Sequence, residues 1–175
     1  IVTQIAGGTA TGITVTGITN TAGTITAQVS AGCTATSGTV RFQVSDGSLT
    51  GTGDLQVNVT ANAQPTLTYN SPQAVAAGGA LTVNPATGPS DNGSVTSIVL
   101  QSAGTYTGTI SVNNTTGVVS ISNAAPAGNH TITITITDNC NATTNASFTL
   151  SVGCVTSLTV NNLGDGADAT PGNGV

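Results

Sequence analysis

The chain has 175 residues, a net charge of −5 and only 4% charged side chains, whereas an ordinary globular domain carries about a quarter. Arg41 is its only Lys or Arg, so little is available to neutralise phosphates, and no nucleic-acid partner is expected. The negative charge also disfavours an anionic membrane surface. No apolar run approaches the roughly 20 residues of a membrane-spanning helix, so no membrane insertion is expected.

Residues 1–60 predict a first group of β-strands. After the turn sequence Asn20–Gly23, apolar and polar residues alternate over Val40–Asp46, and another strand is expected over Leu55–Thr60. Alternation with a period of two indicates a strand with one buried face. Residues 61–65 then predict a short linker, because proline at position 65 breaks a β-ladder.

Residues 61–152 repeat this pattern at greater length. The run Thr131–Asp138 alternates strictly between isoleucine and threonine, and the turn sequence Asn114–Gly117 precedes it at nearly the same separation as in the first group. The expected strands are Thr66–Tyr69, Ala80–Val83, Ser94–Gln101, Thr109–Val112, Gly117–Ser120, His130–Thr137 and Ser147–Val152. Seven short strands with Gly, Asn and Pro between them predict an antiparallel sandwich of two sheets.

The first copy of the repeat is the shorter one, because it lacks equivalents of the first strands of the second copy. A sandwich without those strands exposes a sheet edge and part of its core. Either the missing part lies upstream in a longer protein, or another chain supplies a strand. Residues 153–175 predict a strand- and turn-rich tail that begins a further module or acts as a donor strand. We hypothesise that Val155–Asn161 or Ile1–Ile5 pairs with a neighbouring subunit.

The second copy resembles the immunoglobulin-like and cadherin-like repeats of bacterial surface proteins. The resemblance is carried by Ile110–Ile121, Pro126–Gly128, Thr131–Asp138 and Ala146–Val152. It implies an all-β fold class of tandem immunoglobulin-like antiparallel β-sandwiches, the first one incomplete, in a secreted or surface protein. The tail Leu158–Val175 resembles the opening of bacterial domains named for a Cys-Ser-Leu-Arg-Glu-Ala motif.

Three cysteines suggest one disulfide and one remaining thiol in a secreted protein. In an immunoglobulin-like sandwich the loops gather at the two ends, and head-to-tail stacking of modules would bring Cys33, in the loop before the Thr39–Val44 strand, close to Cys140. We therefore expect a Cys33–Cys140 disulfide. Cys154 is left unpaired or for an intermolecular bond. Three free thiols are the alternative.

Asp46 and Asp138 occupy the same place in the two copies. Each carboxylate is expected to accept backbone N–H bonds in a hairpin turn. Calcium is the alternative, and Asp165 and Asp168 in the tail are further weak candidates. Calcium takes six to eight oxygen ligands, however, and the chain has six acidic residues in all. The turn is favoured, so no cofactor is expected, and calcium remains the alternative.

No catalytic residue is predicted. His130 and Asp138 lie on one expected strand about 27 Å apart at ~3.4 Å per residue, too far for a catalytic triad. On a strand, Arg41 should pair with a carboxylate or lie across the sheet. Sites that can carry glycans follow the Asn-x-Ser/Thr pattern at Asn58, Asn92, Asn113, Asn114, Asn129, Asn141 and Asn145.

The expected function is a non-enzymatic structural module of a bacterial surface filament, adhesin or stalk, located outside the cell. Its expected partners are copies of itself or adjoining modules of a longer chain. The alternative function is a carbohydrate-binding accessory module of a secreted enzyme. Such modules present exposed aromatic rings, and the scarcity of Phe, Tyr and Trp disfavours this alternative.

Overall fold

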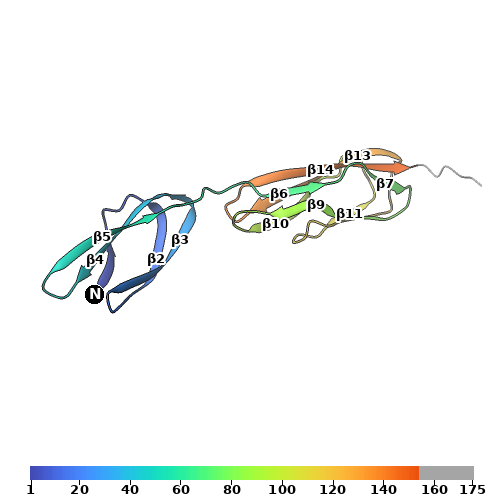
Figure 1. Ribbon diagram of the computed structural model, residues 1–175. Helices are drawn as coiled ribbons and strands as arrows, with labels where there is room; N and C mark the ends of the chain where they lie inside the picture. The colour runs from blue at the N-terminus through green and yellow to red at the C-terminus, as the bar shows by residue number, and fades with distance from the viewer. Residues whose placement is uncertain (154–175) are drawn as a thin grey trace, which may run out of the picture. The chain divides into compact units, whose positions relative to one another are not determined.

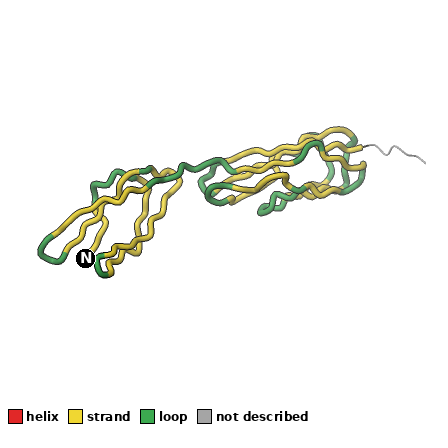
Figure 2. The backbone as a smooth tube through the Cα atoms, viewed as in Figure 1, coloured by secondary structure: helices red, strands yellow, loops and turns green. Residues whose placement is uncertain are grey.

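The computed structural model describes residues 1–153, and these consist of strands and connecting loops without a helix (Figure 2). No helix in this part of the chain is long and apolar enough to span a membrane. The strands are β1 (Val2–Ile5), β2 (Thr11–Thr21), β3 (Thr24–Thr36), β4 (Gly38–Ser45), β5 (Thr50–Val57), β6 (Thr66–Tyr69), β7 (Gln73–Ala76), β8 (Leu81–Val83), β9 (Pro85–Ser90), β10 (Val95–Ser102), β11 (Thr109–Val112), β12 (Val119–Ser122), β13 (Gly128–Asp138) and β14 (Thr143–Gly153).

Strands β6–β14, which we call the second module, form an immunoglobulin-like sandwich (Figure 1). One layer has the order β11-β12-β8 and continues through the β6-β9 pair, since β8 and β9 are separated only by Asn84. The other layer has the order β10-β13-β14-β7, in which β7 runs parallel to β14. With β6 as strand A, β8 and β9 together as B, and β10 to β14 as C to G, these layers correspond to the A-B-E-D and C-F-G sheets of the immunoglobulin fold, and β7 is an additional strand beside G. The fold is therefore all-β with immunoglobulin-like strand order.

The alternating residues of β13 and β14 explain why these strands form the centre of the core. Ile132, Ile134 and Ile136 are completely buried, while the threonines between them are partly exposed. Each buried aliphatic side chain contributes about 1.5–3 kcal/mol of stability. The two layers meet at Tyr69 and Phe148, whose ring centroids lie 5.2 Å apart. Side chains from both sheets thus close a continuous core.

Strands β1–β5, which we call the first module, form two separate small sheets (Figure 1). One has the order β1-β4-β5 and the other is the β2-β3 hairpin. Because β1 pairs with β4 as β10 pairs with β13, the five strands correspond to C, D, E, F and G of the second module. The first module therefore has no counterparts of β6, β7, β8 and β9 among the described residues, and it is an incomplete sandwich.

The turns before β3 and β12 show why the two copies share this layout. Gly23 and Gly117 both have positive φ, 88° and 72°, a conformation that glycine adopts without steric cost. In the first copy the Asn20 side chain accepts the N–H of Gly23, and in the second the Asn113 side chain accepts the N–H groups of Thr115 and Thr116. The Asn-rich, Gly-ended sequence thus reverses the chain into the following strand.

Several sequence-based expectations are corrected by the structure. Strands β7 and β9 were not expected, because β7 has only four residues, and because Pro and Gly interrupt the sequence of β9 and hide any alternation. The strand expected at Gly117–Ser120 begins at Val119, and that expected at Leu55–Thr60 runs from Thr50 to Val57. Val2–Ile5 pairs with β4 of its own chain and forms the edge of that sheet, so its pairing with a neighbouring subunit through the other side stays a prediction.

Spatial proximity divides the chain into two compact units that differ from the two modules. Among the described residues, the first unit comprises 1–66 together with 89–97 and 136–144, and the second comprises 67–88, 98–135 and 145–153. Asp138, Cys140 and the loop around Asn92 therefore belong to the same compact unit as β1–β5.

Candidate interaction groove

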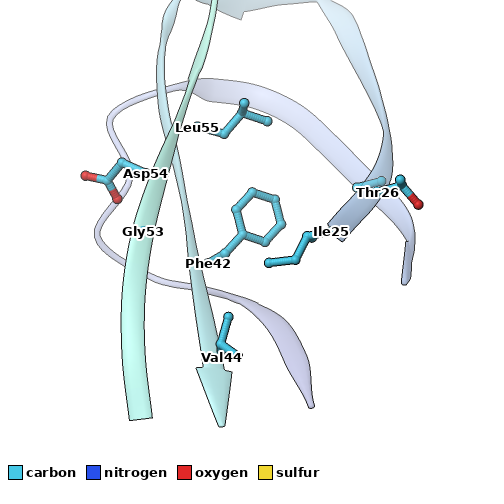
Figure 3. Close-up of a pocket in the computed structure, with 8 residues that line it drawn as sticks. Ile25, Thr26, Phe42, Val44, Gly53, Asp54 and Leu55 are labelled. Atoms are coloured by element: carbon cyan, nitrogen blue, oxygen red, sulfur yellow. The ribbon is translucent and has the colours of Figure 1, made fainter. Parts of the chain in front are cut away.

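An open apolar groove lies between the two small sheets of the first module (Figure 3). It has a volume of about 530 Å³. Figure 3 shows the Phe42 ring at its centre, with Ile25 of β3 pointing toward the ring and Leu55 and Val44 on either side. Thr26, Ala27, Gly53 and Asp54 complete the lining. The alternation that faces Phe42 and Val44 inward thus directs them into a groove rather than a closed core.

Equivalent positions of the two modules show how incomplete this core is. Counted from the turn glycines, Ile25 corresponds to Val119, and counted from the turn aspartates, Val44 corresponds to Ile136. Ile25 and Val44 are 41% and 38% exposed, whereas Val119 and Ile136 are 0% exposed. We call such pairs counterparts. The same apolar pattern is therefore buried in one module and largely open in the other.

The missing cover is a strand at the edge of β3. In the second module β12 lies between β11 and β8, and Val83 of β8 pairs with Val119. Its counterpart strand β3 pairs with β2 on one side only. Within residues 1–153, the other edge of β3 has unpaired backbone groups beside an apolar surface, which is the arrangement that accepts an added strand.

The groove lining includes one charged residue, Asp54, which is paired with Arg41. Arg41 donates two hydrogen bonds to Asp54, at 2.7 and 2.8 Å, and Figure 3 shows Asp54 pointing away from Phe42. This pairing lowers the pKa of Asp54 and raises that of Arg41. Arg41 thus pairs with a carboxylate, which is one of the two arrangements expected, although the sequence did not indicate which carboxylate would be its partner. The cross-strand register of β4 and β5, which places Arg41 opposite Asp54, provides that signal.

The aspartates at the two equivalent turns accept backbone hydrogen bonds. Oδ1 of Asp46 accepts the N–H groups of Ser48 and Leu49, and Oδ1 of Asp138 accepts those of Cys140 and Ala142. The N–H of Leu49 is the main cause of the lowered pKa of Asp46. Within residues 1–153 no group of three or more His, Cys, Asp or Glu could hold a metal ion. The calcium candidates Asp165 and Asp168 lie outside the described residues.

Asp138 differs from Asp46 in being buried, with 1% of its surface exposed. Its second oxygen accepts a hydrogen bond of 2.7 Å from the side-chain amide of Asn62, which follows β5 in the chain. This bond is the main cause of the lowered pKa of Asp138, and it outweighs the opposing effect of burial. The sequence predicted the turn, but it gave no signal for the amide partner 76 residues away.

A disulfide joins Cys33 and Cys140, the pair expected from the sequence, with the two Cα atoms 5.4 Å apart. Cys33 was expected in a loop, but it lies near the end of strand β3. Strand β3 pairs with β2 over most of its length, with register irregularities between Thr11 and Ile13 and between Thr16 and Thr19. Cys154 lies outside the described residues.

His130 and Asp138 are separate features of β13 and not parts of one site. His130 is buried, its Nδ1 lies 2.8 Å from the Thr105 hydroxyl and its Nε2 lies 2.8 Å from the Pro126 carbonyl oxygen. Since a carbonyl only accepts, Nε2 donates there. The ring thus secures the loop before its own strand. All seven Asn-x-Ser/Thr asparagines are exposed, namely Asn58, Asn92, Asn113, Asn114, Asn129, Asn141 and Asn145.

The sequence matches no protein-family model and no curated protein. Among solved structures, the chain is similar to fibronectin(III)-like modules of Clostridium thermocellum CbhA, with 14% identity, 93% of this chain and 99% of that chain covered, and a TM-score of 0.41. It is similar to the protocadherin GammaB4 extracellular domain, with 17% identity, 81% of this chain and 27% of that chain covered, and a TM-score of 0.42. An endo-fucoidan hydrolase of glycoside hydrolase family 107 shows 21% identity, 83% and 24% coverage, and a TM-score of 0.32.

The chain therefore spans about a quarter of the length of the hydrolase and protocadherin structures. Such identities and TM-scores do not bear on activity. The immunoglobulin-like assignment rests instead on the strand order of the second module.

Proposed function

We propose that this chain is a non-enzymatic structural part of an extracellular bacterial surface protein, such as a filament, adhesin or stalk, that assembles end to end and by strand exchange. The observation that carries the proposal is the incomplete first module, whose apolar groove and second β3 edge are covered by no strand among residues 1–153. A protein whose module is completed by another polypeptide segment is suited to building assemblies.

Two further observations support an extracellular location. A disulfide between Cys33 and Cys140 is stable in oxidising compartments and rare in the reducing cytosol. The exposed faces carry Thr, Ser and Asn side chains that bond to one another, as in the pairs Thr133–Ser147 and Thr135–Asn145. This surface is polar without depending on charge, so salt should affect its solubility little.

The carbohydrate-binding alternative gains no support from the aromatic residues. Sugar sites normally present exposed rings, but Phe42, Tyr69, Tyr106 and Phe148 are between 2% and 9% exposed. These four are all the Phe, Tyr and Trp residues of the chain. No specific observation therefore favours a sugar-binding site.

The location is tested on cells of the source organism with antibodies raised against this chain. We expect labelling of intact cells and, after blocking of free thiols, recovery of the Cys33–Cys140 peptide under non-reducing conditions. An intracellular protein that carries the same epitope serves as the control, because it should be labelled only after the cells are permeabilised. Labelling only after permeabilisation, together with free Cys33 and Cys140 thiols, would reject the extracellular assignment.

Assembly is tested separately on the purified chain by negative-stain electron microscopy across a concentration series. Assemblies of repeating units are expected at high concentration. Particles of single-chain size at every concentration would reject the assembly role.

A further inference from the structure

A four-residue sequence that forms part of the second module recurs in the tail. Leu81–Asn84 and Leu158–Asn161 are both Leu-Thr-Val-Asn. The second copy of this sequence lies outside the described residues. A related sequence, Leu55–Asn58, differs only in having Gln at its second position. In both described cases the Leu-x-Val part lies in a strand, as β8 or as the end of β5. In each case a polar residue, Thr or Gln, separates the apolar Leu and Val, and this alternation favours a strand that pairs in a sheet.

The first copy of the sequence fills a defined position in the second module. Leu81, Thr82 and Val83 pair antiparallel with Ile121, Ser120 and Val119 of β12. Val83 is 2% exposed, whereas Thr82 faces outward. This strand covers the part of the core that remains open in the first module.

The counterpart of β12 is the free edge of β3. Counted from the turn glycines, Val119, Ser120 and Ile121 correspond to Ile25, Thr26 and Ala27. All three of the latter residues line the groove. We propose that Leu158–Asn161 of a second copy of this chain adds antiparallel to β3, with Val160 opposite Ile25 and Leu158 opposite Ala27. This inference names the donor segment and its register within the assembly role proposed above, and it rests on that role.

The chemistry of the groove fits this segment. Val160 beside Ile25 would cover that side chain, which is 41% exposed, and Leu158 would lie beside the small Ala27 in the groove lining. Thr159 faces outward, as Thr82 does. Residues Val155–Asn161 carry no charge, and the nearest charged lining residue, Asp54, is already paired with Arg41 and points away from Phe42. No charge is therefore buried when the strand docks.

Chain length favours the tail of a second copy over the tail of the same chain as the donor. Four residues lie between Gly153 and Leu158, and the five Cα–Cα steps limit the separation of these two residues to about 18 Å. Gly153 and Thr143 are at opposite ends of β14, about 34 Å apart at ~3.4 Å per residue. Thr143 follows closely on Cys140, which is bonded to Cys33 of the groove-bearing module. The tail of the same chain thus starts from the far end of β14, whereas the tail of another copy carries no such constraint.

The register is tested with introduced cysteines in the full chain, with Cys154→Ser as background so that no other thiol remains outside the disulfide. One variant carries Ile25→Cys and another carries Val160→Cys. Residues directly opposite across antiparallel strands have Cβ atoms within reach of a disulfide. We expect a covalent heterodimer when the two are mixed and mildly oxidised, with a yield at least about fivefold above that of the control pair Thr26→Cys and Val160→Cys.

The contribution of the apolar contacts is tested by sedimentation of uncrosslinked chains. Val160→Ser removes a side chain expected to be buried and should raise the dissociation constant of self-association by about tenfold or more. Thr159→Ser, on the outward side of the same segment, should leave it within about twofold. Neither variant alters a described residue, so failure to fold does not confound the comparison.

Three results would overturn the inference. The first is a heterodimer yield no higher than that of the Thr26 control. The second is a link that forms only within a chain carrying both Ile25→Cys and Val160→Cys, which assigns the groove to its own tail. The third is unchanged self-association in the Val160→Ser variant. Cell-surface labelling is independent of all three, so the extracellular role can stand while this donor assignment fails.

Discussion

Replacing isoleucine by alanine at Ile25 and, separately, at Ile136 compares the same substitution in an open groove and in a closed core. The two side chains are identical, and both project from strands that belong to the repeated pattern. Ile136 is completely buried, whereas Ile25 is 41% exposed. The difference in cost therefore measures how far the first module lacks its cover.

The expected magnitudes follow from burial. Truncating a fully buried Ile to Ala costs about 2–5 kcal/mol, because transfer energy is lost and a cavity remains. At Ile25 a little over half of the side chain is covered, and complete burial contributes about 1.5–3 kcal/mol, so the loss is about 1 kcal/mol. Little cavity term is expected there, because the groove is already open to water.

The two modules can be followed separately. Both tyrosines, Tyr69 and Tyr106, belong to the second module, so urea unfolding monitored by tyrosine fluorescence reports that module. Amide hydrogen exchange of peptides from β3 and β4 reports the first module. Ile136→Ala should shift the fluorescence transition strongly and Ile25→Ala should not. Equal costs at the two positions in dilute, monomeric protein would refute the open-groove interpretation.

Three other perturbations give measurable outcomes. Because the pKa of Asp138 is lowered in the folded state, its contribution to stability is complete above the ordinary value of 3.8 and is lost as the pH falls through the folded-state pKa. The melting temperature of Asn62→Ala should therefore depend less on acid pH than that of the native chain. Identical pH profiles of the two proteins would contradict the role of Asn62. Burial raises the pKa of Tyr69 to about 12, so phenolate absorbance should show a late titration that Tyr69→Phe removes. The free energy of unfolding should decline as the pH rises from 10 through about 12. A single titration at 10 would argue against this burial. Replacing Cys33 and Cys140 by serine should lower the free energy of unfolding by up to about 4.8 kcal/mol, the chain-entropy value for a separation of 107 residues, as measured by urea denaturation; an unchanged midpoint would show that the bond does not restrain the unfolded chain.

The elements predicted best from the sequence are those in which local pattern and tertiary burial agree. Thr66–Tyr69 and Thr109–Val112 were predicted to the residue, and Thr131–Asp138 falls within β13. Strands β7 and β9 were missed because their pairing, not their composition, makes them strands. β7 is short and lies parallel to β14, and β9 contains two prolines and a glycine.

For the candidate site, the sequence predicted the truncation of the first module but not the groove that results from it. The residues facing that groove, Ile25, Phe42, Val44 and Leu55, lie on three strands, and only the arrangement of β3 against β4 and β5 brings them together. The amide of Asn62 on Asp138 is likewise a contact over 76 residues that no local pattern encodes. Sequence periodicity identifies which face of a strand is apolar, and topology decides what covers that face.

Leu55 and its counterpart Phe148 make this dependence explicit. The N–H of Asp46 donates to the carbonyl oxygen of Leu49, and that of Asp138 donates to the carbonyl oxygen of Ala142. Leu55 and Phe148 each lie six residues after that carbonyl residue, on the strand that follows the turn. Leu55 is 44% exposed and Phe148 is 2% exposed, and Phe148 packs against Tyr69 of β6, a strand without a counterpart in the first module. An apolar residue retained at an exposed position is explained most simply when that position is covered in the functional state. The pattern of the first module thus agrees with the proposal that another segment supplies its remaining strand, and the Ile25–Val160 crosslinking experiment tests which segment does so.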